Sequence, residues 1–382
     1  MGRLLLVSHA GELGGAEYVL LDVARHYGPR CHVVLFADGP LRGRLKADGI
    51  GATVLQADER LLGVRRGGGA LRTLASAPAV ARMAWRLARI ARGFDVLYPN
   101  SQKAAVVTML VGQLVKRPVI WHLHDILSSE HFAAVQRRLV VRLANATARG
   151  VIVNSEATRA AFVACGGNPA RVQVVLNGVD EAQFAGIERF DAAGMRRSLG
   201  LEGVKLVGLF GRLTPWKGQH VLVNALAALP GVHALMVGEA LFGEDDYRER
   251  LRTQAARLGV ADRVHWLGFR SDVPQLMRTV DVVLHASTLP EPFGRVIVEG
   301  MLAQRPVLAA DHGASRELLG AEDAMLVPPG DAGHLAMAIT RTLAMPPEQV
   351  RMLTERNAER ARRLFLLRRM MLGIEGALEL AA

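Results

Sequence analysis

The stretch 205-KLVGLFGRLTPWKGQHVL-222 joins an apolar run of strand length to a loop with glycine and proline, and then to a helical pattern. A strand, a short loop and a helix form the unit from which parallel sheets are built. The same alternation starts first at Leu4, and a polar stretch near 180–200 interrupts it. Because the alternation starts twice, the sequence predicts an α/β protein with two doubly wound domains.

The alternation also predicts where the strands lie. We expect strands at 4–8, 32–36, 96–98, 118–122, 150–153, 205–210, 234–237, 264–267, 282–284 and 306–309. At roughly 100–200 residues per domain, the length of 382 residues also favours two domains. The expected boundaries are 1–185 for an N-terminal domain and 186–360 for a C-terminal domain, with 361–382 as a last helix.

The composition excludes several classes of protein. Half of the residues are apolar and the mean hydropathy is +0.19, which excludes global disorder. Two cysteines, Cys31 and Cys165, cannot form a disulfide framework and fit a reducing compartment. The uncharged run 104–115 has 12 residues, which is too short to span a bilayer, and it predicts a buried helix. With no visible secretory signal, we expect a cytoplasmic protein.

The positive charge lies mostly in the first half of the chain. Net charge is +11, and residues 1–185 carry 23 Lys and Arg against 13 Asp and Glu. Residues 60–92 hold eight arginines, including Arg65 and Arg66 before three glycines. In the helical pattern at 80–90, an apolar stripe faces away from the arginines. This pattern fits either docking on an anionic membrane or a helix packed on a sheet with its arginines in water. Nucleic acid is disfavoured because aromatic residues are only 5%.

Two motifs of the first half follow predicted strands, where ligands of parallel sheets bind. Gly14 and Gly15 stand between a strand and a helix and fit either a ligand-binding turn or a merely flexible one. The absence of G-x-G-x-x-G argues against a nicotinamide cofactor. His122 and His124 share one face of a strand end. They could be a metal pair without a third ligand, core histidines or a site histidine, and the location favours the last.

Two further motifs lie in the second half. Arg212 and Lys217 flank a loop before a helix, which predicts a clamp for a diphosphate rather than two solvated charges. The stretch 291-EPFGRVIVEG-300 carries two glutamates eight positions apart, Glu291 on a loop after a strand and Glu299 within a helix. Phe293 and Gly294 offer backbone N–H groups at the start of that helix.

In this order and spacing, the motifs resemble those of the retaining glycosyltransferases of family 4, which have the GT-B fold. The resemblance runs from about residue 4 to about 330 and includes 177-NGVD-180. It implies two facing Rossmann-like domains with the active site in the cleft between them. It also implies that the last helix returns to the N-terminal domain, although this tail lacks an aromatic-rich ending.

The resemblance assigns roles to the site residues. Arg212 and Lys217 would hold the diphosphate, Glu299 the ribose and Glu291 the donor sugar, beside the N–H groups of Phe293 and Gly294. Gly14 and Gly15 would lie near the diphosphate, and His124 would lie near the reacting centre. His124, Glu291, Arg212 and Lys217 are the expected catalytic residues.

The implied activity is transfer of a sugar, with retained configuration, from a UDP- or GDP-type donor to a glycan or a polyprenyl- or other lipid-linked acceptor. This would serve bacterial-type polysaccharide or glycolipid synthesis, on the inner face of the plasma membrane if the basic half docks there. We expect no cofactor and no metal, because Arg212 and Lys217 supply the charge and no Asp-x-Asp follows a strand. A sugar-nucleotide epimerase and a non-catalytic binding subunit are the alternatives.

Overall fold

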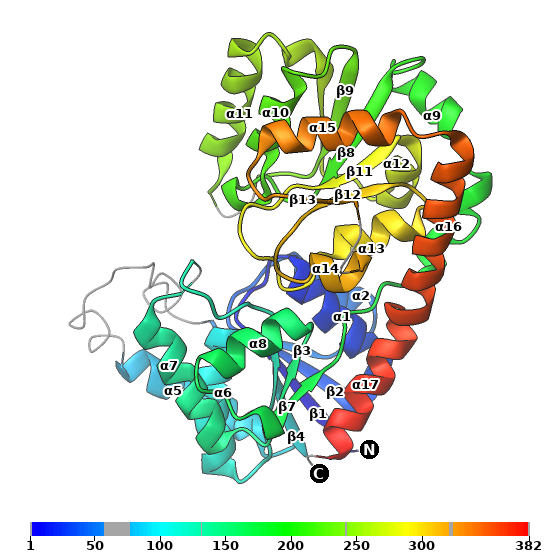
Figure 1. Ribbon diagram of the computed structural model, residues 1–382. Helices are drawn as coiled ribbons and strands as arrows, with labels where there is room; N and C mark the ends of the chain where they lie inside the picture. The colour runs from blue at the N-terminus through cyan, green and yellow to red at the C-terminus, as the bar shows by residue number, and fades with distance from the viewer. Residues whose placement is uncertain (1, 57–76, 131, 241–242, 321–323, 381–382) are drawn as a thin grey trace. The chain divides into compact units, whose positions relative to one another are not determined.

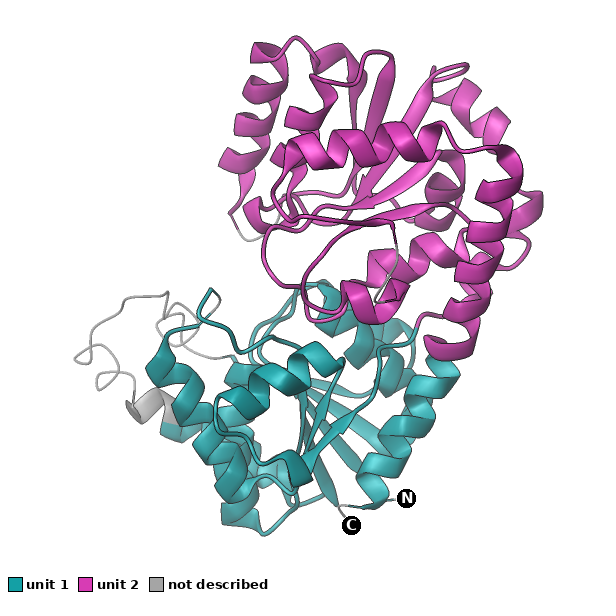
Figure 2. Ribbon diagram, in the orientation of Figure 1, with its two compact units in different colours: residues 1–178, 367–382 teal, residues 179–366 magenta. Residues whose placement is uncertain are grey.

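The chain crosses twice between two units of the computed structural model, at Gly178/Val179 and at Leu366/Leu367 (Figures 1 and 2). Unit 1 is Met1–Gly178 with Leu367–Ala382, and unit 2 is Val179–Leu366. The structure describes residues 2–56, 77–130, 132–240, 243–320 and 324–380. Residues 179–185 and 361–366 thus belong to unit 2, and the backbone N–H of Val179 donates to the carbonyl of Phe365 at 2.8 Å.

Unit 1 contains parallel strands in the order β3-β2-β1-β4, followed by β5-β6-β7. A backbone bridge between Leu97 and Val119 links the two groups. The strands are β1 Leu4–Ser8, β2 Cys31–Leu35, β3 Ala52–Val54, β4 Val96–Pro99, β5 Ile120–Leu123, β6 Gly150–Val153 and β7 Val172–Val174. The order reverses between β1 and β4, so the loops after these strands face a switch point where ligands bind.

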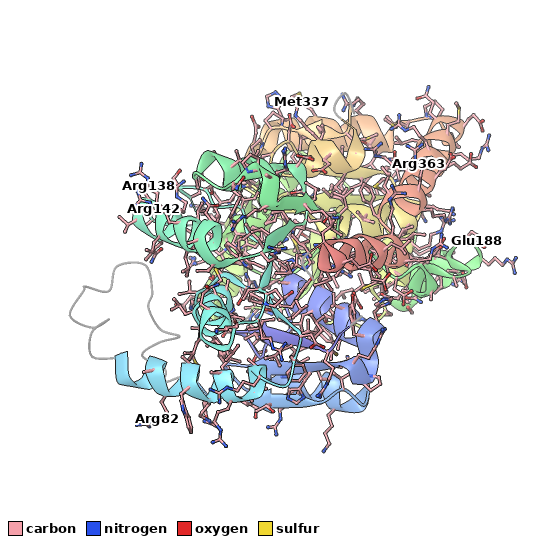
Figure 3. The ribbon with its side chains drawn as sticks, turned by 90° about the horizontal axis from the view of Figure 1, so that it is seen from below. Arg82, Arg138, Arg142, Glu188, Met337 and Arg363 are labelled. Atoms are coloured by element: carbon pink, nitrogen blue, oxygen red, sulfur yellow. The ribbon has the colours of Figure 1, made fainter. Side chains whose placement is uncertain are left out.

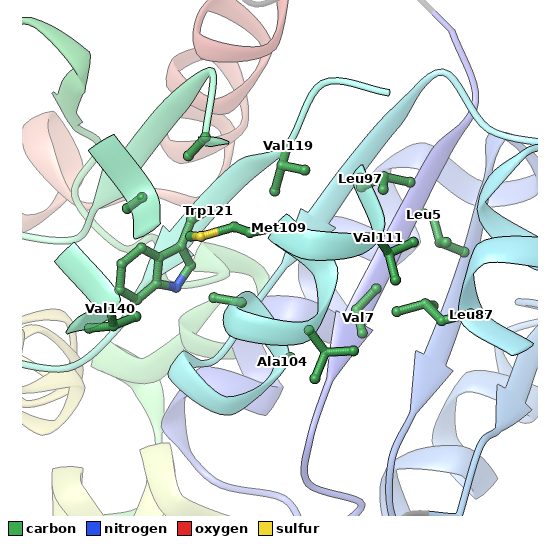
Figure 4. Packing of buried hydrophobic residues seen from close by; sticks show 14 of the residues in the cluster. Leu5, Val7, Leu87, Leu97, Ala104, Met109, Val111, Val119, Trp121 and Val140 are labelled. Atoms are coloured by element: carbon green, nitrogen blue, oxygen red, sulfur yellow. The ribbon is translucent and has the colours of Figure 1, made fainter. Parts of the chain in front are cut away.

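Helices cover both faces of the unit 1 strands. Successive side chains of a strand point to opposite faces, so each helix layer buries every second side chain. They are α1 Gly15–Tyr27, α2 Pro40–Ala47, α5 Ala77–Ala91, α6 Gln102–Val115, α7 Ala134–Thr147, α8 Glu156–Ala164 and α17 Leu367–Glu379. Helices α5, α6 and α7 pack on one core, which includes Leu5, Val7 and Trp121 (Figure 4). Helices α1, α2 and α17 pack on the opposite core, which includes Leu4 and Leu6.

Unit 2 contains a second parallel sheet in the order β10-β9-β8-β11-β12-β13. Its strands are β8 Lys205–Phe210, β9 Val232–Val237, β10 Val264–Gly268, β11 Val282–His285, β12 Val307–Ala310 and β13 Leu326–Val327. Its helices are α9 Ala192–Ser198, α10 Gln219–Leu226, α11 Asp245–Arg257, α12 Val273–Thr279, α13 Arg295–Leu302, α14 Ser315–Leu319, α15 Ala332–Leu343 and α16 Pro347–Leu364. The order reverses between β8 and β11, which places both conspicuous motifs of this half at a switch point.

The predicted α/β class is confirmed, and each of the ten expected strands overlaps an observed one. The prediction missed β3, β7 and β13, which are two- or three-residue strands at sheet edges. Within the segment 81–90, Met83 and Leu87 are buried in the core, and Ala84 and Ile90 pack against it. The loop at Arg65 and Arg66 lies outside the described residues.

The prediction of a buried helix at 104–115 is wrong for one side of that helix. Val106, Leu110 and Leu114 of α6 are 37%, 54% and 68% exposed. Uniformly apolar composition predicts burial on every side, but α6 is an outer layer of the unit and covers the sheet with one face only. In the described part of the chain, no helix is both long and apolar enough to cross a membrane.

Candidate functional site

Glu291 lies at the centre of a polar cluster in unit 2. Its Oε1 accepts a hydrogen bond of 2.6 Å from the ammonium of Lys217. Its Oε2 accepts bonds from His285 Nε2 at 2.7 Å and from Ser287 Oγ at 2.8 Å. The ammonium of Lys217 also lies 4.5 Å from the centre of the Trp216 ring, a cation–π distance. Three side chains, one from the loop after β8, one from the last residue of β11 and one from the loop after β11, therefore converge on one carboxylate.

The two loops meet because β8 and β11 are adjacent at the switch point. The loop after β8 carries Lys217, and the loop after β11 carries Glu291. The N–H of Thr288 donates to the carbonyl of Trp216 at 2.7 Å, which ties the loops together. Gly218 has φ of +75°, and a Cβ there would overlap the carbonyl oxygen of Ala286. Only glycine permits this close approach.

The pKa of Glu291 reflects two opposing effects. Burial raises it, but the charges and hydrogen bonds of Lys217 and His285 outweigh burial and hold it well below its usual value of 4.5. Glu291 is therefore an ionised carboxylate with its oxygens engaged. An ammonium has three N–H donors, and Lys217 directs one of them at Glu291, so others remain for an anionic ligand.

The other predicted residues of unit 2 lie on the same elements. Arg212 begins the loop after β8, and its carbonyl accepts a bond of 2.9 Å from Gln219. Glu299 lies on α13 and pairs with Arg295 one turn earlier, at 3.4 Å. Gly294 precedes α13 with φ of +86°, and the buried ring of Phe293 packs edge-on against Phe365. The expected donor contacts of Phe293, Gly294, Arg212 and Glu299 stay predictions.

Unit 1 holds a second polar cluster at its own switch point. Nε2 of His124 lies 2.9 Å from Oδ1 of Asn100, and Nδ2 of Asn100 donates to the carbonyl of Ala16 at 2.9 Å. Because the amide nitrogen of Asn100 is used as a donor, its oxygen accepts, and Nε2 of His124 must carry the proton. The cluster therefore fixes one tautomer of His124.

Both histidines of the sequence motif are buried. The ring of His122 lies 3.9 Å from that of His124, centre to centre, and its Nδ1 is 2.7 Å from the hydroxyl of Tyr98. Burial lowers the pKa of His124 to about 3 and that of His122 well below 6.5. Both rings are thus neutral at physiological pH. Among the residues that the structure describes, no group of three His, Cys, Asp or Glu could hold a metal, which leaves the metal pair without support.

The two glycines of the first sequence motif lie at the start of α1. Helix α1 begins at Gly15, and Gly14 is its N-cap residue with extended backbone. A Cβ at Gly15 would meet nothing within 4 Å. The carbonyl of Ala16 in the first turn of α1 accepts from Asn100, so this turn is joined to the His124 cluster.

Sequence reasoning missed three residues of these clusters, Asn100, His285 and Ser287. Each lies at the end of an apolar strand or just after it, which is where ligands of parallel sheets bind. The position of a polar residue at the end of a predicted strand could therefore have identified these three residues. Of the predicted site residues, the unit 2 cluster contains Lys217 and Glu291, and the unit 1 cluster contains His124.

Comparisons with known proteins show the family and the fold of the chain. The profile of the family described as Glycosyltransferase Family 4 matches residues 13–183, and that of Glycosyl transferases group 1 matches residues 193–360. The lipopolysaccharide core biosynthesis mannosyltransferase LpsB of Rhizobium meliloti is 32% identical over 161 residues, 40% of this chain and 45% of the relative. The phosphatidyl-myo-inositol mannosyltransferase of Mycolicibacterium smegmatis is 32% identical over 258 residues, 65% of this chain and 62% of the relative. The match to each of these two thus spans less than two thirds of the relative's length.

A solved structure matches over nearly the whole chain. HepE of Anabaena, crystallised with UDP and glucose, is 38% identical with a TM-score of 0.87, and the match covers 99% of this chain and 100% of HepE. Sucrose-phosphate synthase of Thermosynechococcus elongatus, at 22% identity and a TM-score of 0.79, shares the fold. The parallel sheets, the motif residues at their switch points and these matches show that the chain belongs to glycosyltransferase family 4 and has the GT-B fold.

Proposed function

We propose that the protein transfers a sugar, with retained configuration, from a nucleoside-diphosphate sugar to a glycan or lipid-linked acceptor. The observation that carries the proposal is the Lys217–Glu291 pair at the switch point of unit 2, with Arg212 on the same loop. A transferase must stabilise the diphosphate that leaves, and two cations beside a helix start meet that need. The UDP complexes of HepE support a UDP-type donor, and UDP-glucose, also crystallised with HepE, is the first candidate.

The geometry of the two clusters supports the roles of Lys217, Glu291 and His124 in this proposal, and the family resemblance supports that of Glu299. Lys217 is held in place by Glu291 and Trp216, so it is oriented before the diphosphate arrives. Glu291, with three donors on its oxygens, positions the donor sugar and orients Lys217 rather than acting as a covalent nucleophile. Glu299 binds the ribose, and neutral His124 contributes hydrogen bonding near the reacting centre.

The mechanism proposed for retention uses the leaving phosphate to deprotonate the acceptor on the same face of the sugar. Retention by double displacement requires a carboxylate nucleophile and an acid/base partner about 5 Å away. The ionised, hydrogen-bonded Glu291 is poorly suited to the first role. We propose that Arg212 and Lys217 replace a metal ion in neutralising the diphosphate.

The acceptor class rests on relatives. One matched relative is a lipopolysaccharide core mannosyltransferase and another acts on phosphatidyl-myo-inositol, as their names state. We therefore propose a glycan or lipid-linked acceptor in bacterial-type polysaccharide or glycolipid synthesis. The glycosyltransferase relatives do not favour the epimerase or the non-catalytic subunit.

The first experiment is calorimetric titration with UDP, GDP and ADP, followed by UDP-release assays with UDP-glucose and candidate acceptors. We expect UDP to bind, and Lys217→Ala and Arg212→Ala each to weaken it by about tenfold or more. Lys205→Ala is the matched control, because this exposed lysine lies at the opposite end of the same strand, β8. Undiminished UDP affinity in both site variants would contradict the proposed clamp.

The second experiment concerns the product. Proton NMR of the glycoside made from an α-linked donor should show an α-linkage, and chelation of divalent cations should leave the rate unchanged. Inverted product would refute retention, and a rate abolished by chelation and restored by Mg²⁺ would refute metal independence. Interconversion of the donor sugar without any acceptor would favour the epimerase instead.

A further inference from the structure

Three neighbouring helices of unit 1 carry cations and no anions. Helix α6 packs against both α5 and α7, and the three helices cover the same face of the sheet. Within Ala77–Ala91, Gln102–Val115 and Ala134–Thr147 there is no Asp or Glu. These segments hold seven cationic residues, which are Arg82, Arg86, Arg89, Lys103, Arg137, Arg138 and Arg142. Figure 3 shows Arg82, Arg138 and Arg142 projecting outward.

The same helices expose large apolar side chains. On α6, Val106, Leu110 and Leu114 recur every four residues and form one stripe, 37%, 54% and 68% exposed. On α7, Val135 and Leu139 are 76% and 67% exposed, and on α5 Trp85 is 58% exposed. These six are half of the twelve large apolar side chains that are exposed in the described part of the chain. We call the outer side of α5, α6 and α7 the three-helix face.

The three-helix face differs from an ordinary solvated helix layer. A solvated layer presents charged or polar residues outward and its apolar stripe inward. Here α5 meets that rule with its inward stripe, whereas α6 is apolar on both sides. The outward side of α7 carries both cationic and apolar side chains, with Arg138 beside Leu139 and Arg142 one turn later. Apolar side chains among cations, without carboxylates, match the interface of a bilayer with anionic headgroups.

We propose that the three-helix face docks on an anionic lipid bilayer, with Leu110, Leu114 and Leu139 entering the headgroup region and the arginines pairing with lipid phosphates. This deepens the proposed function, on which it rests, because it would bring the enzyme to a lipid-linked acceptor at the inner face of the plasma membrane. The proposal thus extends the membrane surface expected from the sequence, at 80–90, to α6 and α7. The stripe of α5 is used in the core, and α6 and α7 supply most of the exposed apolar side chains.

Two other occupants fit less well. A second copy of this chain, packed face to face about a two-fold axis, would bring the same arginines together, since such interfaces pair like surfaces. Nucleic acid would pair with the cations but would leave the exposed leucines and valines without a favourable partner, because it is read through phosphates, base edges and aromatic stacking. A bilayer accommodates both kinds of side chain.

The test is flotation of the full chain with vesicles of phosphatidylcholine alone and of phosphatidylcholine with phosphatidylglycerol. We expect binding to the anionic vesicles and not to the neutral ones, with affinity falling as salt rises. Leu110→Gln together with Leu114→Gln should lower the partition coefficient by about tenfold. Arg138→Gln together with Arg142→Gln should lower it by about fivefold per arginine.

Matched controls come from the opposite side of unit 1. Leu372→Gln changes a leucine of α17 that is 62% exposed, and α17 packs on the core opposite α5, α6 and α7. Arg44→Gln with Lys46→Gln removes two exposed cations of α2, which packs on the other core. Both controls should bind anionic vesicles as the parent chain does. Circular dichroism and UDP titration of every variant report folding and the donor site separately.

Several outcomes would overturn the proposal. These are absence of binding to either vesicle, equal binding to both, or equal losses in the controls and the face pairs. Loss of vesicle binding after the arginine changes with no loss after the leucine changes would contradict the entry of Leu110 and Leu114 into the headgroup region. A chain that binds UDP and not vesicles would refute the face alone, whereas one that binds vesicles and not UDP would refute the proposed donor site.

Discussion

The ammonium of Lys217 lies 2.6 Å from the carboxylate of Glu291, although 74 positions separate them in the chain. Their side chains are only 17% and 13% exposed. In this setting the loss of one partner leaves a largely desolvated charge behind. The pair therefore links the stability of unit 2 to its candidate donor site.

We expect Lys217→Met and Glu291→Gln each to lower the free energy of unfolding by about 2 kcal/mol, and the double variant to lose less than the sum. Chemical denaturation of the four chains gives the coupling energy. The control is the pair Arg351 and Glu348 on α16, which has the same 2.6 Å separation but is 58% and 65% exposed. Its coupling should stay below about 1 kcal/mol. Equal coupling in the two pairs would show that burial at Glu291 adds nothing.

Acid should destabilise unit 1 through its buried histidines. The pKa of His124 is about 3 in the folded protein, lowered by burial from 6.5. Below pH 6.5 His124 binds a proton in the unfolded chain but not in the folded one. The contribution of His124 to the free energy of unfolding is therefore fully present above pH 6.5 and is lost as the pH falls toward 3. Between roughly pH 6 and 4, we expect His124→Gln to reduce the slope of the free energy of unfolding against pH by about 1.4 kcal/mol per pH unit. Denaturation followed by tryptophan fluorescence would measure it, and an unchanged slope would contradict a neutral, buried His124.

Asn100 is expected to act on the reaction through His124. Asn100→Ala removes the acceptor of the His124 N–H and the donor to Ala16. We expect kcat to fall by about tenfold, and Asn100→Ala with His124→Ala to cost little more than His124→Ala alone. Asn100→Asp, which keeps an acceptor oxygen, should retain more activity. Asn168→Ala, at an exposed asparagine of the same unit, should have no effect. Fully additive losses would show that Asn100 does not work through His124.

Gly218 tests the close approach of the two loops in unit 2. Gly218→Ala should lower the free energy of unfolding by about 3 kcal/mol or more, because its Cβ would overlap the carbonyl of Ala286. Gly231→Ala is a matched control, since Gly231 has nearly the same φ, +73° against +75°, and open space around it. It should cost only about 1 kcal/mol. Thermal and chemical unfolding would measure both, and similar losses would mean that backbone conformation alone requires glycine at 218.

The sequence predicted the features that follow from local pattern. Ten strands, the two doubly wound sheets and the family resemblance rest on apolar runs and motif spacing, which neighbouring residues along the chain determine. The edge strands β3, β7 and β13 were missed because strands of two or three residues have too few positions to show a pattern.

Contacts between distant residues depend on tertiary structure. The sequence placed Glu291 and Lys217 in one site, but only the adjacency of β8 and β11 brought their charges together and added His285 and Ser287. The exposed side of α6 was also decided in three dimensions, since composition alone predicts burial all round. The chain by itself thus determines periodicity and residue order, whereas strand order and layer packing decide which side chains are paired, buried or left at the surface.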